Sequence, residues 1–517
     1  MSDLNAFNSV ELGVFASRIE SICEEMGAQL RRSAFSPNIR DRLDYSCAIF
    51  DATGGLCAQA AHIPVHLGSM AYAMKDVVGR FDWRDGDQVI LNDPFLGGTH
   101  LPDVTLIQPV FVAQALVGFV ANRAHYADIG AVSPGSMPLS RSIEEEGLLI
   151  PPQRIARQGR VDRAAVARIV SATRNAVDAA GDLQAQMACN RRGVERLTQL
   201  VESLGQDGYT AALAALNRYA EKLARSVLRR LKPGSHVFRD VMESDGIGRD
   251  PAIIEVRLRL SAGLLEVDFS GSSGQVAGNI NAPLPVTVAA VWYVFRCLMP
   301  AQAPACEGCF RPLRVIAPEG SLLNARSPAA VAAGNVETSS RVVDVMLGAL
   351  AQALPDEIPA ASQGTMNNFA FGSDGDQPWG YYETLGGGMG AGARHAGLSC
   401  VQSHMTNTRN TPVEVLEMRY PVRIERYAQR RGSGGAGKHR GGDGLIREYR
   451  FTEAAQATLL TERREVRPWG LAGGGAGQVG LNLLNGRPLA AKCQIDLHPG
   501  DKVTIETPGG GGWGVAS

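Results

Sequence analysis

The strongest constraint on the fold of this chain is a pair of β-like runs joined by only two residues. Val104–Val112 and Ala115–Ala124 are rich in β-branched and apolar residues, and Ala113-Gln114 separates them. Two such runs with a two-residue connection predict an antiparallel hairpin. The open ends of this hairpin meet, so residues near Asp103 lie opposite residues near His125, with directly opposed Cα atoms about 4.5–5.5 Å apart.

A polar stretch, NDPFLGGTHLPDV from Asn92 to Val104, leads into the hairpin. It carries His100 three positions before Asp103, so both are expected to join His125 at one end of the sheet. Two imidazoles and a carboxylate suit zinc, manganese or ferrous iron, and such a set leaves coordination positions open. The alternative is structural, with aspartates capping turns and histidines bonded to the backbone. Spacing alone leaves both interpretations open.

Further donor residues lie upstream. His62 and His66 in HIPVHLGSM are separated by Pro64, which argues against one helical face. By themselves these histidines are expected to line a pocket or the core. Asp41 and Asp44 in RDRLDYS each offer a further oxygen, and the residues alone do not choose between them.

The rest of the chain mixes helical and β patterns. Apolar positions at helical spacing predict a helix over Val10–Arg32. Tyr45–Gln59 is expected to form a hairpin that turns at Thr53-Gly54-Gly55. Residues 161–231 show a helical pattern that ends at Lys232-Pro233-Gly234, as a helix stop should.

Short strands with glycine-rich joins are expected to dominate the second half. AIIEVRLRLSAGLLEVDFSG predicts a hairpin around Ser261-Ala262-Gly263. We therefore predict a multi-domain α+β protein with mixed, largely antiparallel sheets and a helical segment near 160–231. The expected domains are 1–235, which would carry the metal site, and 236–517, which would be α+β and rich in glycine.

Composition narrows the functional classes. The chain has 517 residues and a formal net charge of −1, so no global field draws in nucleic acid or an anionic membrane. The longest apolar run, Pro283–Phe295, is too short for a membrane span, and the N-terminus has no secretory pattern. Nine cysteines occur singly apart from Cys306-Glu-Gly-Cys309, for which a structural role is favoured over zinc binding. We expect a cytoplasmic protein without nucleic-acid or membrane partners.

Two glycine-rich stretches resemble nucleotide-binding loops without meeting their requirements. GSGGAGKH, Gly432–His439, has the spacing of a phosphate-binding loop, but His439 stands where serine or threonine should bind magnesium. A polar segment precedes it, and no apolar helix is expected after it. GGGMGAG, Gly386–Gly392, lacks a βαβ setting and an acidic residue about 20 positions later. The sequence therefore offers no ATP-binding motif of a known type.

Many longer segments resemble one family throughout the chain. They are RLDYSCAIFD, HIPVHLGSM, LNDPFLGGTHLPDVTLIQPVF, NRAHYADIG, GCFRPLRVIAPEGSLLNA, GNVETSSRVVDVMLGAL, YYETLGGGMGAG, MTNTRNTPVEVLE and TPGGGGWG. By these segments the chain resembles the hydantoinase B/oxoprolinase family. That family comprises B-type subunits of ATP-dependent hydantoinases and lactamases, and the matching part of 5-oxoprolinase. The alpha subunits of acetone and acetophenone carboxylases are more distant relatives.

The resemblance implies a division of labour between two subunits. An A-type ATPase partner would bind ATP and magnesium, and the B-type chain would bind a divalent metal in a hetero-oligomer such as α2β2. By similarity, His100, Asp103 and His125 match the metal ligands, and Asp41 joins them. The family often has glutamate at the Asp41 position, which leaves direct ligation by the shorter aspartate in doubt.

The implied reaction is ATP-dependent hydrolysis of a cyclic amide such as a hydantoin, 5-oxoproline or a lactam. The partner would phosphorylate the amide carbonyl oxygen, and the metal site of this chain would activate the attacking water. Asp128 or His66 would accept a proton, or else hold a ligand in place. The glycine-rich loops are expected to be structural turns, with phosphate binding by their N–H groups as the alternative.

Two other functions remain open at this point. One is carboxylation of a ketone enolate with activated bicarbonate, although the chain lacks the extra length of those alpha subunits. The other is a scaffold subunit that has lost its site, against which the intact set of His100, Asp103 and His125 argues.

Overall fold

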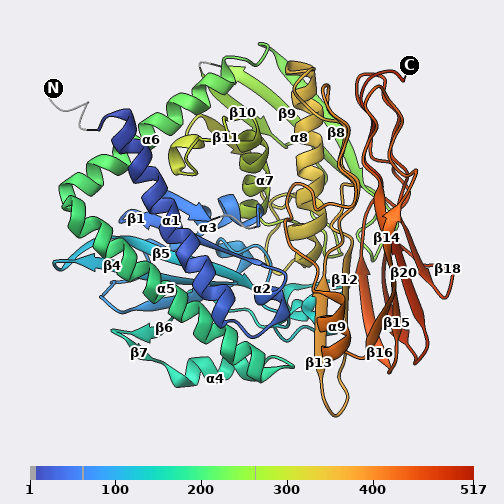
Figure 1. Ribbon diagram of the computed structural model, residues 1–517, viewed down its shortest axis with the longest axis horizontal. Coiled ribbons are helices and arrows are strands. Elements are labelled where there is room, and N and C mark those ends of the chain that lie inside the picture. The colour runs from blue at the N-terminus through green and yellow to red at the C-terminus, as the bar shows by residue number, and fades with distance from the viewer. Residues whose placement is uncertain (1–6, 61–62, 262, 517) are drawn as a thin grey trace.

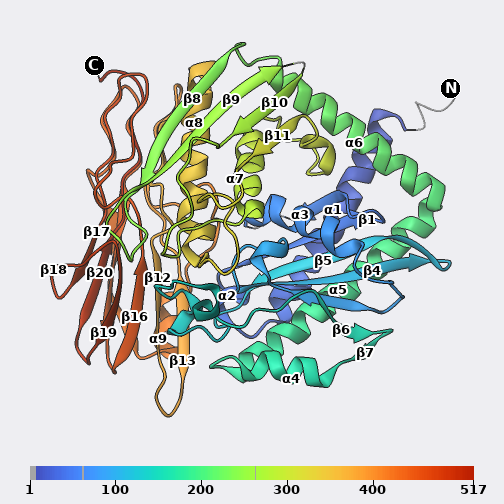
Figure 2. The same cartoon turned by 180° about the vertical axis from the view of Figure 1, so that it is seen from behind.

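The structure is a computed structural model that describes residues 7–60, 63–261 and 263–516. Within these residues the strands form four sheets, and only β10 and β11 pair in parallel. Figures 1 and 2 show the N-terminal sheet in the lower half on the side of the N-terminus, a second sheet above it, and two C-terminal sheets along the opposite side. The predicted α+β class with largely antiparallel sheets is confirmed.

The central sheet contains seven strands in the order β2-β1-β5-β4-β3-β6-β7. Their bounds are β1 (Tyr45–Asp51), β2 (Leu56–Ala60), β3 (Gln88–Leu91), β4 (Asp103–Val112), β5 (Ala115–His125), β6 (Gln153–Arg157) and β7 (Arg160–Val161). The β1–β2 hairpin forms where the alternating pattern predicts it. Short 3-10 turns join the strands at η1 (Pro94–Leu96), η2 (Pro134–Ser136) and η3 (Ile143–Glu146).

The predicted β4–β5 hairpin is confirmed, and its register contains a bulge. Ala113 and Gln114 both adopt positive φ, as a two-residue hairpin turn requires. Val112 pairs with Ala115 at the turn, but beyond Val110 the pairing shifts by one residue because Val117 has no partner. Asp103 is therefore directly opposite His125.

Helices cover both faces of the central sheet. Their bounds are α1 (Ser9–Ser33), α2 (Pro37–Arg40), α3 (His66–Val78), α4 (Arg163–Ser171), α5 (Ala176–Leu204) and α6 (Gln206–Leu228). α5 packs on β4 and β5, and α1 packs on α5 and β2. A capping box between Asn8 and Glu11 starts α1, and its apolar stripe, including Phe15 and Met26, is buried. α3 packs on β1 from the opposite face.

The second sheet leads to a buried helical pair. Its order is β11-β10-β9-β8, with β8 (Ser235–Met242), β9 (Ala252–Ser261), β10 (Leu264–Asp268) and β11 (Leu313–Ile316). The β9–β10 hairpin is confirmed, while its turn residue Ala262 lies outside the described residues. The helices that follow are α7 (Leu284–Cys297), η4 (Glu307–Cys309), the π-helical turn η5 (Gly334–Thr338) and α8 (Ser339–Ala353). α7 contacts α3 and α8, and α8 contacts β8 and β9.

The C-terminal third forms two sheets that share one side of the molecule (Figure 1). One has the order β13-β12-β16-β19 and the other β14-β15-β20-β17-β18. Their bounds are β12 (Asn368–Ser373), β13 (Trp379–Glu383), β14 (Val422–Arg430), β15 (Gly444–Phe451), β16 (Ala455–Leu460), β17 (Leu481–Leu484), β18 (Arg487–Pro488), β19 (Lys492–Leu497) and β20 (Lys502–Glu506). The short helix α9 (Val413–Arg419) precedes β14.

A layer of glycine-rich segments packs beside these sheets. We call residues 386–392, 432–444, 470–477 and 509–514 the glycine layer. A Cβ atom added to Gly388 would lie 2.0 Å from the carbonyl oxygen of Gly442, and one added to Gly510 would lie 2.0 Å from that of Met389. Backbone therefore packs directly on backbone, which only glycine permits at such separations.

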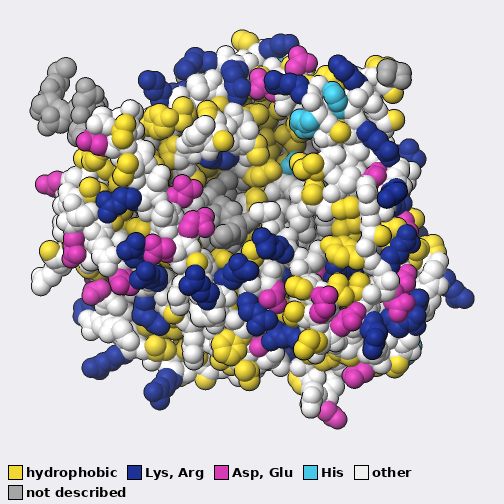
Figure 3. All heavy atoms as spheres, in the orientation of Figure 1, with side chains coloured by type: hydrophobic (Ala, Val, Ile, Leu, Met, Phe, Trp, Pro, Cys, Tyr) yellow, Lys and Arg dark blue, Asp and Glu magenta, His cyan; other side chains and the backbone are white. Residues whose placement is uncertain are grey.

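The largest cluster of buried apolar side chains continues across residue 235. It includes Ile49 of β1, Val256 of β9, Val343 of α8 and Leu460 of β16. The division into domains 1–235 and 236–517 remains a prediction. No helix in the described part of the chain is both long and apolar enough to cross a membrane. Basic and acidic side chains are interspersed on the face in Figure 3, which is hollowed near its middle.

Candidate metal centre

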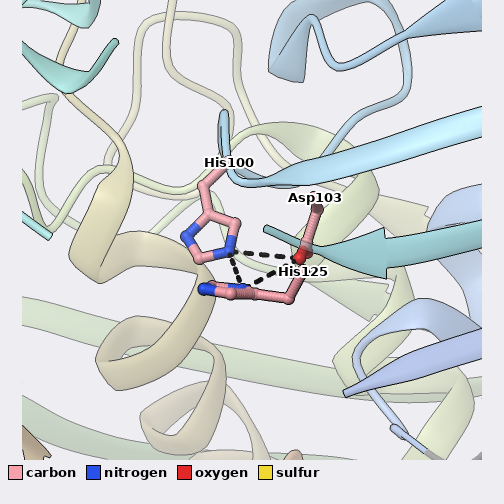
Figure 4. Close-up of side chains that lie close together, drawn as sticks. All are labelled: His100, Asp103 and His125. Carbon is pink, nitrogen blue, oxygen red and sulfur yellow. Dashed lines mark hydrogen bonds and ion pairs between the residues drawn. The ribbon is translucent and has the colours of Figure 1, made fainter. Parts of the chain in front are cut away.

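Three predicted ligands meet at the end of the β4–β5 hairpin (Figure 4). His125 Nδ1 lies 3.2 Å from Asp103 Oδ1, and His100 Nε2 lies 3.4 Å from the same oxygen. The two imidazole nitrogens are 3.3 Å apart. All three residues are buried. The hairpin places Asp103 and His125, and the turn after η1 brings His100 over them.

These separations fit a shared cation. Ligand atoms about 2.1 Å from one ion, at tetrahedral or right angles, lie about 3.0–3.4 Å from one another. The three donor atoms have this spacing, and each residue turns a potential ligand atom toward the other two (Figure 4). Among the described residues no other group of histidine, cysteine and carboxylate side chains has a comparable arrangement. The donor set therefore fits a divalent metal.

The second oxygen of Asp103 is held by two other side chains. His66 Nε2 lies 3.3 Å from Asp103 Oδ2, and the Thr99 hydroxyl donates to the same oxygen. His66 Nδ1 lies 3.0 Å from the Ser46 hydroxyl, so both of its ring nitrogens are occupied. Such outer contacts fix the orientation of a ligand carboxylate.

Burial and neighbouring charges act in opposite directions in this cluster. Burial would raise the pKa of Asp103, but the nearby His100 and His66 outweigh it and hold this pKa well below its usual range. Burial would lower the pKa of His100, yet the Asp103 carboxylate raises it. For His125 burial dominates and lowers the pKa. The cluster thus holds an anionic carboxylate between imidazoles of different basicity.

A buried carboxylate fixes the backbone behind His100. His100 Nδ1 lies 3.4 Å from the carbonyl oxygen of Ala332. The Glu146 carboxylate accepts hydrogen bonds from the N–H groups of Val331 and Ala332 and from the Ser140 hydroxyl. Burial raises the pKa of Glu146 to about 7. Nothing in the spacing of Glu146 pointed to this role.

The side chains of His100, Asp103 and His125 line a small cavity, which we call the histidine cavity. Its volume is about 20 Å³. Its other polar walls come from distant segments, namely Asp44, His66, Asn335, Tyr382, Thr384, Thr406 and Thr408. The Tyr382 ring stacks on the His125 ring with centroids 5.0 Å apart. Both halves of the chain therefore build the cavity.

Asp44, and not Asp41, lies beside the cluster. Asp44 Oδ2 is 4.0 Å from His125 Nδ1. Asp41 pairs with Arg40 at 3.1 Å and lines a separate surface pocket. Leu43 between them adopts φ 59°, a turn that sends the two carboxylates to different places. The structure thus does not bring Asp41 to the three ligands.

The two candidate proton acceptors, His66 and Asp128, also lie in different places. His66 lines the histidine cavity, whereas Asp128 lies outside it and pairs with Arg174 at 2.9 Å. Asp128 also accepts from the backbone N–H of Arg174 and from Ser136. These bonds occupy both carboxylate oxygens. His62 lies outside the described residues.

The glycine-rich loops use their N–H groups within the protein. In the loop that resembles a phosphate-binding motif, Gly435 donates to Gly510, Lys438 to Gly514, and His439 to Trp513. Gly442 donates to Met389 in the same layer. The expected structural role fits these bonds, because the same N–H groups are no longer free to surround a phosphate.

Comparison with known proteins places these features in a family. The sequence matches the family described as Hydantoinase B/oxoprolinase over residues 8–516. A 5-oxoprolinase from Dictyostelium discoideum is 41% identical over 516 residues, which are 98% of this chain and 40% of that protein. This chain thus spans about two fifths of the length of that relative.

Solved structures agree with this assignment. An ATP-dependent caprolactamase from Pseudomonas jessenii is 27% identical, with a TM-score of 0.92 over 99% of this chain and 92% of that one. A nucleotide-free acetone carboxylase is 18% identical, with a TM-score of 0.87 over 98% of this chain and 76% of that one, and it shows the fold alone. The chain belongs to the hydantoinase B/oxoprolinase family, whose named members include ATP-dependent hydrolases of cyclic amides.

Proposed function

We propose that this chain performs the hydrolytic half of an ATP-dependent ring opening of a cyclic amide. The substrate class comprises hydantoins, 5-oxoproline and lactams. The observation that carries the proposal is the cluster of His100, Asp103 and His125, all buried, in a member of this family. The names of the relatives favour amide hydrolysis over ketone carboxylation, because the carboxylase likeness extends only to the fold.

An A-type ATPase is the partner that the proposal requires. Resonance makes an amide carbonyl a poor electrophile, and phosphorylation of its oxygen creates a leaving group. The matching 5-oxoprolinase is much longer than this chain, which leaves room in that protein for a separate ATP-binding part. We therefore place ATP and magnesium on the partner, within a hetero-oligomer such as α2β2.

His100, Asp103 and His125 would hold the divalent metal, which we propose is zinc, manganese or iron. When bound, such an ion supplies Lewis acidity that lowers the pKa of water and stabilises developing negative charge. Asp44 is the nearest further carboxylate and replaces Asp41 as the additional anionic group in this proposal.

The remaining residues would orient these groups and exclude solvent. His66 and Thr99 hold Asp103 so that its other oxygen faces the two ligand histidines. We assign His66 to this positioning role and Asp128 to holding Arg174. The buried walls of the histidine cavity keep bulk water from an activated substrate, which would otherwise be lost to side reactions.

Reconstitution tests the proposal. The chain is purified together with its ATPase partner, and ring opening of hydantoin, 5-oxoproline and caprolactam is measured with ATP. We expect ATP-dependent ring opening and bound metal by elemental analysis. His100→Ala should lose both, and His395→Ala, which changes an exposed histidine, should lose neither. Inert cyclic amides together with bicarbonate-dependent consumption of ketones would show that the proposal is wrong.

A further inference from the structure

Asn335 gives the histidine cavity a side-chain oxygen that has no partner among the described residues. Its side chain lines the cavity, and the residue is only 4% exposed. No residue in the described part of the chain donates to its carboxamide oxygen. Buried polar groups are almost always hydrogen-bonded, because burying such a group without a hydrogen bond costs about 1–3 kcal/mol. The carboxamide oxygen is therefore available to a donor from outside the chain.

The π-helical turn η5 fixes the position of Asn335. The N–H groups of Ala333 and Gly334 both donate to the carbonyl of Asn279 at 3.0 Å. A Cβ atom on Gly334 would lie 1.8 Å from the carbonyl oxygen of Asn281, so this contact needs glycine. π-helical turns inside helices occur frequently at functional sites. In this protein the π-helical turn carries Asn335, whose side chain lines the histidine cavity.

The same turn also supports the histidine on the other side of the cavity. The Glu337 carboxylate accepts from the N–H of Met366 at 2.8 Å and from the Asn368 amide at 2.7 Å. Asn368 in turn accepts from the Tyr382 hydroxyl, and the Tyr382 ring stacks on His125. One short segment thus fixes both Asn335 and the ring plane of a proposed ligand.

The size and walls of the cavity indicate the ligand that Asn335 binds. A volume of about 20 Å³ has room for a single water molecule. A buried water needs two to four polar partners. Besides Asn335, the residues that line the cavity include His125, whose Nε2 has no partner in the described part of the chain, and Thr406 and Thr408 with their hydroxyls. These groups suit one water beside the three ligands.

We propose that Asn335 binds and orients the water that attacks the activated amide carbon. This inference rests on the proposed function. The Asn335 Oδ1 accepts one O–H, which directs a lone pair of the water toward the carbon. The water oxygen bonds to that carbon and the ring C–N bond breaks. Both water protons end on the nitrogen as an amine, which leaves an acyl phosphate for a second water to hydrolyse to carboxylate and phosphate.

Competition between water and hydroxylamine tests this role. The complete complex is assayed with ATP and a lactam, at a hydroxylamine concentration that traps a measurable fraction of product. Hydroxylamine that attacks the activated amide in place of the first water and displaces phosphate gives a cyclic amidoxime, whereas hydroxylamine that reacts with the acyl phosphate gives a ring-opened hydroxamate. Asn335→Leu keeps the side-chain volume but removes the acceptor, so the ratio of cyclic amidoxime to ring-opened product should rise about tenfold, the value of one hydrogen bond. Asn335→Asp keeps an acceptor oxygen and should stay within about twofold of wild type.

Asn38→Leu is the matched control. Asn38 is also a buried asparagine whose side chain has no partner in the described residues, but it does not line the histidine cavity. Its substitution should leave the product ratio unchanged. If Asn335→Leu lowers turnover and leaves the ratio at the wild-type value, Asn335 has a structural role and the inference is wrong.

A crystal structure of the wild-type chain separates the inference from the proposed function. We expect an ordered water within hydrogen-bonding distance of Asn335 Oδ1 in the histidine cavity. A cavity without such a water overturns the inference even if the complex opens lactams. Wild-type complex that shows no ATP-dependent ring opening contradicts the proposed function, and the role of Asn335 in hydrolysis is then rejected with it.

Discussion

The histidine cavity and the glycine layer are both built from unusual residues concentrated in short stretches, and they bury different groups. The cavity encloses side-chain atoms with unused hydrogen-bonding capacity, such as Asn335 Oδ1 and His125 Nε2. The glycine layer encloses backbone N–H groups that already donate to carbonyls of neighbouring segments. The two regions therefore differ in whether unpaired polar side-chain atoms line a cavity beside proposed ligands, and not in the density of conspicuous residues.

The glycine layer should be the more sensitive of the two regions in stability. Gly442→Ala would place a Cβ atom 1.9 Å from the carbonyl oxygen of Leu398, where backbone would have to move. We expect a loss of about 4 kcal/mol or more in the free energy of unfolding. Chemical denaturation measures this free energy of unfolding. Gly13→Ala in α1 has no atom within 4 Å of the new Cβ and should be neutral or stabilising.

The histidine cavity should be the more sensitive region in activity. Asp103→Asn keeps the size of the side chain and removes the charge between His100 and His125. We expect kcat to fall by about 10²–10³-fold and the metal content to fall with it. Steady-state kinetics measure kcat, and elemental analysis measures the metal content. Retention of full metal content would argue against Asp103 as a ligand.

A buried charge outside both regions should affect stability alone. Asp128→Asn weakens the pair with Arg174, and breaking a buried pair typically costs about 3 kcal/mol. The free energy of unfolding should fall by about this amount, while kcat changes by less than about threefold. A far larger loss of kcat in a folded variant would restore Asp128 as a candidate proton acceptor.

The smallest expected effect distinguishes the two upstream aspartates. Asp44→Asn should reduce kcat/KM by about tenfold, because this carboxylate lies next to His125. Asp41→Asn should stay within about twofold of wild type, since Asp41 pairs with Arg40 away from the cavity. The reverse order of effects would place the Asp41 carboxylate at the site in the working complex.

The parts of the fold that the sequence predicts depend on local patterns. The helix at Val10–Arg32 and the hairpin at Tyr45–Gln59 appear close to their expected bounds, because periodicity and turn residues act over a few positions. The two-residue turn between β4 and β5 brings the ends near Asp103 and His125 together, and the bulge at Val117 then sets these two residues directly opposite each other. Short-range rules were sufficient to predict that the three proposed ligands lie near one another, but they did not predict the bulge.

The parts that sequence reasoning missed depend on contacts between distant segments. The pairing of Asp128 with Arg174 joins residues 46 positions apart. Asp44 lies at the site in place of Asp41 because Leu43 adopts a positive φ. Leucine rarely adopts this conformation, so the sequence does not predict the turn. The π-helical turn that places Asn335 has no distinct apolar period, so only the tertiary contacts of Gly334 reveal it.

The bulge at Val117 has a consequence for how this protein family can change. Without it, the pairing of Val112 with Ala115 would continue in step and set Ala124 opposite Asp103. Side chains alternate between the faces of a strand, so pairing Val117 in step would also turn His125 to the face opposite that of Asp103. The residue opposite Asp103 thus depends on a bulge eight positions from His125, near the turn of the hairpin. Deleting Val117 alone would remove the bulge and keep Asp103 opposite His125, whereas a length change that the bulge does not absorb would replace the partner of Asp103 while the hairpin still forms.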